Sequence, residues 1–295
     1  MILVADSGST KCDWVIFDNS GQTILRISTS GMNPRLLNSG QMRQIVYGNR
    51  ELNALKEEIE KVFFYGAGCA NGKSCTNLRK VLADFFSNAR ITIEGDLTAA
   101  VLGATSRPGV VCVLGTGSNC CYYDGESIHV KQPSLGYMVM DECSGNYFGK
   151  KLLQAYFYKK MPHELFDRFG KQYDLSFEVI MKNLYGNRNP SSYLAGFSRF
   201  LIDNRSVPFM ERIIKRGIGE LFDDLISWYQ KELVHHPLHF VGSIGYFLQE
   251  EIILEGARRG YMMGSFVKSP MDGIVADRTD LIEKVKTIYN QNEKP

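Results

Sequence analysis

The sequence carries no excess of charge, no apolar run of membrane length and no paired cysteine motif. Its 34 basic and 32 acidic side chains leave a net charge of +2, which gives no electrostatic reason to expect nucleic acid or an anionic membrane as a partner. No apolar run approaches the roughly 18 residues that span a bilayer. The N-terminus, MILVADSGSTK, lacks the basic leader of a secretory signal. We therefore expect a cytoplasmic protein that binds neither membranes nor nucleic acids.

Cysteine is present, but not in a pattern that is typical of a metal site or a disulfide framework. The seven thiols include no CxxC pair, and most lie in apolar runs, where a thiol behaves as a small hydrophobic side chain. A reduced, cytoplasmic setting fits this usage. His235, His236 and His239 lie within five residues, but Pro237 interrupts any helical or strand spacing. They predict a polar loop before a strand and not a metal site.

The chain is long enough for two domains of ordinary size. It has 295 residues, of which 44% are apolar and 22% are charged, values that are typical of a globular protein with a substantial core. The stretch Ser106-Arg107-Pro108-Gly109 is the best candidate for a domain join. We expect an N-terminal domain at 1–106 and a C-terminal domain at 107–295. A helix at about 278–290 is a candidate to pack back on the first domain.

An internal repeat is the most informative pattern. Twice, a short apolar strand leads into a loop of Gly, Ser and Thr, then a second strand, a turn and a third strand. The expected strands are 2–4, 12–17 and 23–29 in the first copy, and 110–114, 119–123 and 127–130 in the second. Because such loops offer backbone N–H groups and hydroxyls, both can face an anion at close range. Two ordinary hairpins with glycine in their turns are the alternative interpretation.

The segments between and after the repeats predict helices and further buried strands, which places the chain in the α/β class. Helices are expected at 39–61, 75–86, 97–105, 147–160, 178–184, 207–233 and 247–259, and strands at 62–65, 91–94 and 238–241.

Duplicated meanders with phosphate-facing loops are the pattern of the actin, hexokinase and Hsp70 ATPase superfamily, and four motifs carry a closer likeness. They are Asp6-Ser7-Gly8-Ser9-Thr10-Lys11, Gly115-Thr116-Gly117-Ser118-Asn119-Cys120, Asp141-Glu142 and Gly242-Ser243. In these motifs the chain resembles the N-acetylglucosamine kinase family, which is grouped with the BadF/BadG/BcrA/BcrD ATPases. The resemblance implies two ribonuclease-H-like (actin-like ATPase) domains that flank a cleft, and an ATP-dependent sugar kinase that forms a homodimer.

For ATP, the resemblance implies that both hairpin loops bind the phosphates and that a glycine turn opening a later helix receives the adenosine. The residues concerned are Gly8, Ser9, Thr10, Lys11, Gly115, Thr116, Gly117, Ser118, Gly242 and Ser243. Asp6 would hold Mg2+ largely through water, since this ion keeps several waters and prefers phosphate oxygens with one carboxylate. An ordinary strand-to-helix turn is the alternative for Gly242.

The resemblance also implies a catalytic base at Asp96, which follows the strand at 91–94 and begins the small-residue helix at 97–105. Phosphoryl transfer needs positioned phosphates, a metal and a base oriented on the attacking hydroxyl. We expect a helix N-terminus to keep this carboxylate ionised. A helix N-cap is the alternative role, and one residue can serve both.

For the sugar, the resemblance points to eight residues: Asn33, Gly66, Gly68, Thr116, Gly136, Tyr137, Asp141 and Glu142. A carboxylate such as Asp141 suits bidentate hydrogen bonds to ring hydroxyls, with a helix cap as the alternative. The expected reaction is phosphorylation of N-acetylglucosamine, or a close relative, at the 6-hydroxyl by ATP.

Two departures from the family pattern bear on the sugar. Met140 and Cys143 flank Asp141-Glu142 where the family often has glycine, and Leu135 stands where a tryptophan is often found. The acyl pocket can therefore differ, which leaves N-acetylmuramate and glucosamine open as substrates. Two other functions also stay open: an ATPase that activates an acyl-CoA dehydratase-type partner, and a non-catalytic sugar sensor. No cysteine pair is placed for the subunit-bridging iron–sulfur cluster of such activators.

The stretch GAGCANGKS at 66–74 comes within one residue of the phosphate loop GxxxxGK[ST]. The strict pattern has Gly where Ala67 stands, and the two hairpin loops already account for the phosphates. We interpret 66–68 as one wall of the sugar site and do not expect Lys73 to bind nucleotide.

Overall fold

The computed structural model describes residues 1–8, 10–69, 75–186 and 189–276, which form two compact units. Unit 1 is Met1–Gly103 together with the chain from Ser269 onward, and unit 2 is Ala104–Lys268. The expected join at 106–109 is three residues beyond the observed one. The expected second domain ran to the C-terminus, whereas the chain returns to unit 1 at Ser269. The helix expected at 278–290 lies outside the described residues.

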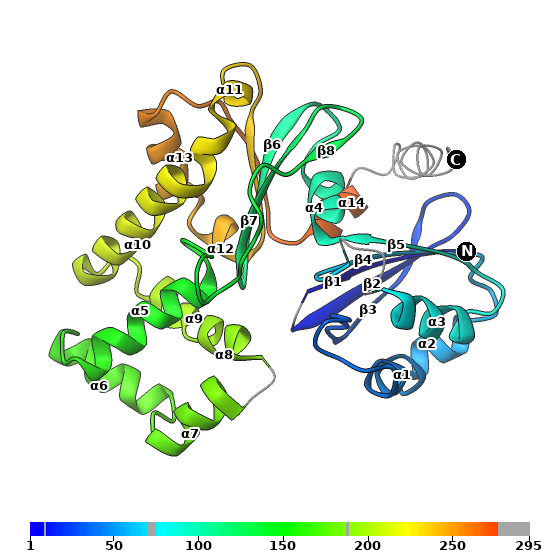
Figure 1. Cartoon of the computed structure of the whole chain (residues 1–295), viewed down its shortest axis with the longest axis horizontal. Coiled ribbons are helices and arrows are strands. Elements are labelled where there is room, and N and C mark those ends of the chain that lie inside the picture. The colour runs from blue at the N-terminus through cyan, green and yellow to red at the C-terminus, as the bar shows by residue number, and fades with distance from the viewer. Residues whose placement is uncertain (9, 70–74, 187–188, 277–295) are drawn as a thin grey trace. The chain divides into compact units, whose positions relative to one another are not determined.

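Unit 1 is built on a five-stranded sheet in the order β3-β2-β1-β4-β5 (Figure 1). Its strands are β1 Ile2–Ser7, β2 Lys11–Phe17, β3 Thr23–Ser30, β4 Lys61–Gly66 and β5 Arg90–Gly95. The first three strands pair antiparallel, and β1, β4 and β5 run parallel. Its helices are α1 Ser39–Tyr47, α2 Arg50–Leu55, α3 Thr76–Phe85, α4 Asp96–Ala104 and α14 Pro270–Ala276.

Both faces of this sheet are buried, because alternate residues of each strand point to opposite sides. Leu3 and Ala5 pack in one core with residues of α1, α2 and α3, whereas Val4 packs in another core with α4 and α14. Figure 1 shows these two sets of helices on opposite faces of the sheet. The close packing of α14 on α4 requires glycine, since a Cβ at Gly103 would lie 2.5 Å from the Pro270 carbonyl oxygen. This contact explains why the chain from Ser269 belongs to unit 1.

Unit 2 repeats the same sheet plan with the order β10-β9-β6-β7-β8. Its strands are β6 Gly109–Leu114, β7 Ser118–Tyr123, β8 Ile128–His129, β9 Leu238–Val241 and β10 Met263–Val267. Here too three strands pair antiparallel and the last two run parallel to the first. The repeat predicted from the sequence is therefore confirmed as two mixed sheets of the same topology.

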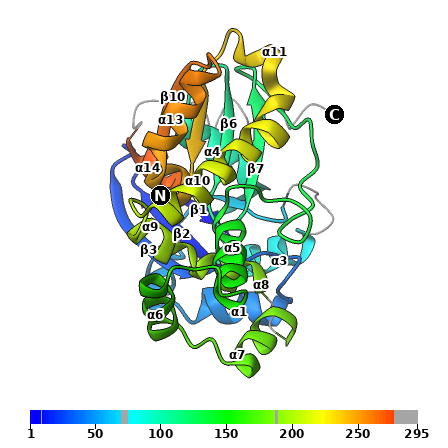
Figure 2. The same cartoon turned by 90° about the vertical axis from the view of Figure 1, so that its left-hand side faces the viewer.

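The helices of unit 2 are more numerous and more interrupted than the periodicity predicted. They are α5 Gly145–Phe157, α6 His163–Gln172, α7 Phe177–Met181, α8 Pro190–Gly196, α9 Ser198–Asp203, α10 Pro208–Glu220, α11 Gln230–Leu233, α12 Ser243–Phe247 and α13 Gln249–Arg258. The single helix expected at 207–233 is α10 and α11 joined by a π-helical turn, Leu221–Leu225, and a 3₁₀ turn, Ile226–Tyr229. In Figure 1 and Figure 2, α10 lies beside α13. Within the described parts of the chain, no helix has the length and apolarity to cross a bilayer.

Candidate active site

In unit 1, the candidate site lies at the carboxyl edge of the parallel strands. β1, β4 and β5 end in register, with Ser7 paired to Gly66 and Gly66 paired to Gly95. Asp6 is the penultimate residue of β1, and Asp96 directly follows β5 as the first residue of α4. Ligands of open α/β sheets bind outside this edge of the strands. The topology thus brings together the two carboxylates that were expected to serve as metal ligand and base.

The hairpin loop between β1 and β2 is fastened to the loop that follows β3. The Gly8 N–H donates to the Lys11 carbonyl at 3.0 Å, and the Gly31 N–H donates to the Thr10 carbonyl at 3.0 Å. The Met32 N–H donates to the Ser7 Oγ at 2.8 Å, a buried bond across 25 residues. Of the ATP-binding residues expected in this loop, Ser9 lies outside the described residues. The Lys11 ammonium lies 2.7 Å from the carboxylate of Asp13.

The two carboxylates are held in an unfavourable electrostatic setting. Burial raises the pKa of Asp6 to about 7, and the negative charges of Asp96 and Asp13 add to the rise, while Lys11 opposes it. Burial also raises the pKa of Asp96, and its own N–H and that of Leu97 at the start of α4 counteract the rise only in part. The helix N-terminus was expected to keep Asp96 ionised, and burial opposes that effect. Such a pair is suited to a bound cation.

The expected sugar wall of unit 1 is formed by the loops after β3 and β4. Gly68 has φ +82, and a Cβ there would collide with Oδ1 of Asn33, so a residue without a side chain is required. Oδ1 of Asn33 also accepts the N–H of Arg35 at 3.0 Å. A Cβ on Gly66 would lie 3.0 Å from Sγ of Cys69. The structure thus brings Asn33, Gly66 and Gly68 together, whereas Lys73 lies outside the described residues.

In unit 2, the second hairpin loop turns its carbonyls toward the start of α5. The Gly115 carbonyl accepts the Gly145 N–H at 2.8 Å, and the Thr116 carbonyl accepts the Asn146 N–H at 3.0 Å. The Gly115 N–H closes the loop on the Gly117 carbonyl at 3.0 Å. No hydrogen bond from the N–H groups of Thr116 and Gly117 is found within the described parts of the chain. These two donors are thus available to an anion.

Asp141 connects the second hairpin loop to α5 by hydrogen bonds. Its side chain is buried, with Oδ1 accepting the Ser118 N–H at 3.2 Å and Oδ2 accepting Nδ2 of Asn146 at 2.8 Å. A Cβ on Gly117 would lie 2.8 Å from Oδ2. The alternative role as a helix cap is wrong, because Ser144 is the N-cap of α5. Both oxygens of Asp141 have partners within unit 2, so its contacts favour loop positioning over a carboxylate turned wholly to a sugar.

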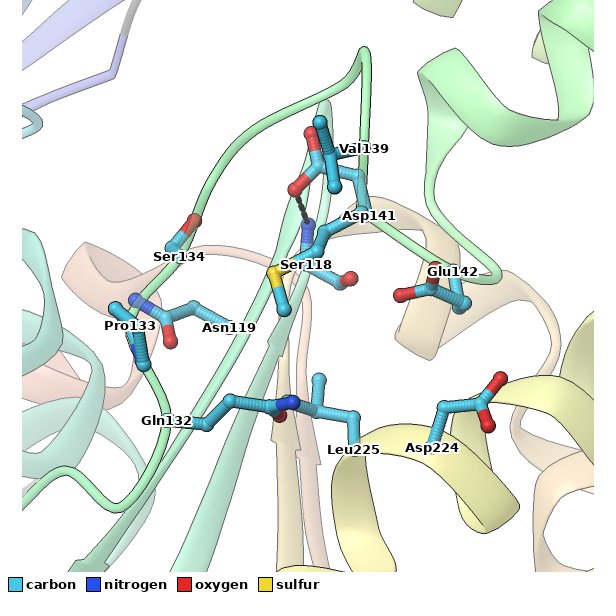
Figure 3. Close-up of a pocket in the computed structure, with 11 residues that line it drawn as sticks. Ser118, Asn119, Gln132, Pro133, Ser134, Val139, Asp141, Glu142, Asp224 and Leu225 are labelled. Atoms are coloured by element: carbon cyan, nitrogen blue, oxygen red, sulfur yellow. Dashed lines mark hydrogen bonds between the residues drawn. The ribbon is translucent and has the colours of Figure 1, made fainter.

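A pocket of about 160 Å³ opens beside Asp141 (Figure 3). It is lined by Ser118, Asn119, Gln132, Pro133, Ser134, Val139, Met140, Asp141, Glu142, Asp224 and Leu225. Burial raises the pKa of Glu142, and the charges of Asp224, Asp141 and Glu220 raise it further. Gly136 and Tyr137 lie in the chain between Ser134 and Val139 but are not among the lining residues. Of the departures, Cys143 is fully buried in the core, and Leu135 is 60% exposed.

The glycine turn after β9 packs against the second hairpin loop. Gly242 has φ +123, and a Cβ there would lie 2.5 Å from the Leu114 carbonyl oxygen and 3.1 Å from the Gly115 nitrogen. Ser243 is the first residue of α12. Glycine is therefore required both by conformation and by the approach of the loop.

A second pocket in unit 2, of about 350 Å³, lies where the start of α10 meets the start of α13. Its lining residues are Arg205, Ser206, Glu211, Ile214, Lys215, Glu250 and Glu251. This pocket could not be identified from the sequence, because nothing in the spacing of these charged residues sets them apart from a solvated helix face.

The chain is similar over nearly its whole length to the "Putative N-acetylglucosamine Kinase (PG1100)" from Porphyromonas gingivalis. The two share 31% sequence identity and a TM-score of 0.86, with 94% of this chain and 98% of that chain covered. The chain belongs to the N-acetylglucosamine kinase-like family of actin-like ATPases. No family model and no curated protein matches the sequence significantly.

More distant structures share the fold of this kinase-like family. A protein with the same description from Chromobacterium violaceum is 17% identical with a TM-score of 0.67, with 93% of this chain and 97% of that chain covered. A ROK family glucokinase from Streptomyces griseus, in complex with glucose and AMPPNP, is 14% identical with a TM-score of 0.54, with 95% of this chain and 98% of that chain covered. The actin-like ATPase fold expected from the sequence is thereby confirmed.

The three histidines at 235–239 do not converge on one site. His235 and His236 lie in the turn before β9, whereas His239 is buried within β9, with Nδ1 2.9 Å from Oγ of Ser265. Burial lowers the pKa of His239 to about 4. Within the described ranges, no group of three or more His, Cys, Asp or Glu side chains is arranged to hold a metal ion.

Asp224 and Gln132 are pocket residues that the sequence analysis missed. Asp224 lies in the π-helical turn, where the chain leaves the regular helical period, so no periodic pattern could place it. Gln132 precedes a proline in the loop after β8, and only its position in the fold brings it to the pocket.

Proposed function

We propose that this protein is an ATP-dependent kinase that phosphorylates N-acetylglucosamine, or a close relative, on its 6-hydroxyl. The observation that carries the proposal is the pair Asp6 and Asp96 at the carboxyl ends of β1 and β5, which lie on either side of β4, with a pKa of about 7 for Asp6. The same edge collects the first hairpin loop and the loop that holds Asn33 against Gly68. A metal ligand, a base and polar groups for a sugar are what phosphoryl transfer to a hydroxyl requires.

Asp96 is the proposed base. A carboxylate whose pKa is raised by burial binds a proton more strongly than one in water, which favours removal of the proton from an attacking hydroxyl. The N–H groups of Asp96 and Leu97 hold the carboxylate at the start of α4 and limit that rise. The proton of the sugar hydroxyl passes to the Asp96 carboxylate as the oxygen bonds to the terminal phosphorus of ATP, and the bond from that phosphorus to the bridging oxygen breaks so that ADP leaves with the electron pair.

Asp6 is the proposed ligand of Mg2+, directly or through water. The residues present fit such an ion, because burial and the repulsion from Asp96 and Asp13 both disfavour the charge on Asp6 in its absence. When bound, Mg2+ would neutralise negative charge on the phosphates. Asp6 would hold the ion, directly or through water, at the end of β1.

The two hairpin loops are the proposed phosphate sites. In the second loop, the N–H groups of Thr116 and Gly117 remain available, while the carbonyls of Gly115 and Thr116 are turned away to α5. Backbone donors in such a loop bind an anion without a charged side chain. We propose that Gly8, Thr10 and Lys11 act in the first loop, and that Gly242 and Ser243 receive the adenosine.

The proposed sugar contacts lie in both units. In unit 1 they are Asn33 and the backbone at Gly66 and Gly68, and in unit 2 they are the pocket beside Asp141 and Glu142. Gly136 and Tyr137 stay proposed contacts. N-acetylmuramate and glucosamine are the alternative substrates.

The test is ADP release by the Asp96→Asn variant with N-acetylglucosamine, N-acetylmuramate, glucosamine and glucose. We expect kcat on the best sugar to fall by about 10²- to 10⁴-fold, the range for loss of a general base, while ATP binding by calorimetry is unchanged. Asp84→Asn is the control, because Asp84 pairs with Arg43 between α1 and α3 and should leave kcat unchanged. Near-normal turnover of Asp96→Asn would reject the assignment. ATP hydrolysis by the wild type that no sugar stimulates would favour the activating ATPase.

A further inference from the structure

The pocket beside Asp141 has one sign of charge. Its eleven lining residues include three carboxylates and no Lys, Arg or His. Two buried polar atoms on its wall, Oγ of Ser118 and Oε1 of Gln132, have no hydrogen-bond partner in the described parts of the chain. Because an unsatisfied buried polar atom costs free energy, a pocket that keeps two of them is built for a ligand or water that supplies the partners. Ser118 is 8% exposed and lines the pocket, so a group bound there can supply its partner.

The three carboxylates differ in how far unit 2 already satisfies them. Asp141 accepts two hydrogen bonds from its own loop and from α5. Glu142 and Asp224 form no ion pair with any described residue, and burial, together with the charge of Asp224, raises the pKa of Glu142. The nearby Glu220 is already neutralised, since it pairs with Arg216 at 2.7 Å and accepts the Tyr147 hydroxyl at 2.7 Å. The charge that a ligand meets is therefore that of Glu142 and Asp224.

The backbone places Asp224 at the pocket by an irregular turn. The helix that begins at Pro208 widens into the π-helical turn Leu221–Leu225. Both Asp224 and Leu225 of this turn line the pocket, and Leu225 also packs in the core. π-turns inside helices are rare and frequently mark functional sites. The neighbouring Asp223 points elsewhere, because its carboxylate pairs with Arg259 at 2.6 Å.

We propose that Glu142 and Asp224 make this pocket a charge filter for the sugar. It admits substituents that donate hydrogen bonds, namely hydroxyls, an amide N–H or an ammonium group, and it excludes a sugar that carries a carboxylate. Glu142 is half-buried and Asp224 is exposed, and both carboxylates repel a like charge brought beside them, whereas donors satisfy the carboxylates and the buried acceptors. This inference rests on the proposed function, since it assumes that the pocket receives part of the sugar. Among the alternative substrates, it selects N-acetylglucosamine and glucosamine over N-acetylmuramate.

Calorimetric binding of N-acetylmuramate and of its methyl ester separates charge from size, because the ester keeps the bulk and loses the carboxylate. We expect the wild type to bind the ester at least about tenfold more tightly than the acid, a difference of about 1.4 kcal/mol. In the double variant Glu142→Gln, Asp224→Asn the two should bind alike. The matched control is Asp223→Asn, which removes a carboxylate from the same turn on the side away from the pocket and should keep the wild-type preference.

Binding of glucosamine is a second test, and it does not depend on room in the pocket for the bulky lactyl group of N-acetylmuramate. We expect the double variant to bind this cation about tenfold less tightly than the wild type, with N-acetylglucosamine changed far less. An acid that binds as well as its ester, a preference that survives in the double variant, or unchanged glucosamine binding would each overturn the proposal. Absence of sugar binding altogether would overturn it as well. Sugar binding with the expected preferences but without ADP release would reject the kinase function and leave the filter standing.

Discussion

Replacing Asp6 with asparagine should stabilise unit 1 at pH 8 while it abolishes catalysis. Folding raises the pKa of this carboxyl from 3.8 to about 7, so the folded state binds the proton more tightly than the unfolded chain does. The free energy of unfolding therefore falls as pH rises from about 4 to about 7, and it stays at the lower value above that range. The difference between these two pKa values corresponds to at most about 4 kcal/mol. Because the site is only partly buried, we expect a gain of about 2 kcal/mol for the uncharged asparagine.

The measurement is urea unfolding without Mg2+ or nucleotide, followed by the fluorescence of Trp14. Trp14 is fully buried in β2 beside β1, and the other tryptophan, Trp228 of unit 2, is replaced by phenylalanine so that unit 1 alone is observed. Asp6→Asn should gain stability at pH 8 and lose most of that gain at pH 4, where the wild-type carboxyl is protonated in the folded state.

A control of opposite sign is Asp18→Asn. Hydrogen bonds from the Ser20 hydroxyl and from the N–H of Gln22 lower the pKa of Asp18, so its ionised form is the one that folding favours. This variant should lose stability at pH 8 and not gain it. An Asp6→Asn variant that is no more stable than the wild type at pH 8, or one whose gain persists unchanged at pH 4, would refute the reasoning.

Two glycine substitutions should separate the proposed sugar site from the nucleotide site. Gly68→Ala places a Cβ at φ +82 against Oδ1 of Asn33, and we expect KM for the sugar to rise about tenfold with KM for ATP unchanged. Gly242→Ala places a Cβ at φ +123 and 2.5 Å from the Leu114 carbonyl oxygen. In this variant we expect KM for ATP to rise about tenfold, with KM for the sugar unchanged. Gly219→Ala in α10, where a Cβ meets nothing within 4 Å, is the control and should change neither constant. An effect of Gly68→Ala on ATP alone would contradict the assignment.

The sheets could be predicted from the sequence because their signal is local. Leu3, Val4 and Ala5 form a continuous apolar run, and that is what a strand buried on both faces requires. The two matched loops of Gly, Ser and Thr then predicted that the sheet is duplicated. β10 was missed since Gly264 and Ser265 interrupt its apolar pattern, and the reason for them lies 26 residues away along the chain. A Cβ at Gly264 would lie 2.5 Å from Nδ1 of His239, and Oγ of Ser265 lies 2.9 Å from that same nitrogen.

The candidate site was predicted less completely, because several of its residues depend on backbone geometry. Asp141 has φ +76 and Cys143 has φ +60, conformations that non-glycine residues rarely adopt and that a sequence pattern does not reveal. The turn they form directs Asp141 beneath the hairpin loop. The sequence pattern placed Asp141 at the site but could not show that Ser118 and Asn146 already occupy its oxygens.

The shared topology explains why expected sugar contacts follow the third strand in both units. In a meander of three antiparallel strands, the third strand ends at the same edge of the sheet as the first, so the chain that follows it passes the first hairpin loop. Unit 1 fastens this segment through the Ser7 hydroxyl, which accepts the Met32 N–H beside Asn33. Unit 2 fastens it through Asp141, which accepts the Ser118 N–H beside Glu142. The fastening groups differ, but each places a polar side chain next to a candidate phosphate loop. The site is thus positioned by strand order first and by residue identity second.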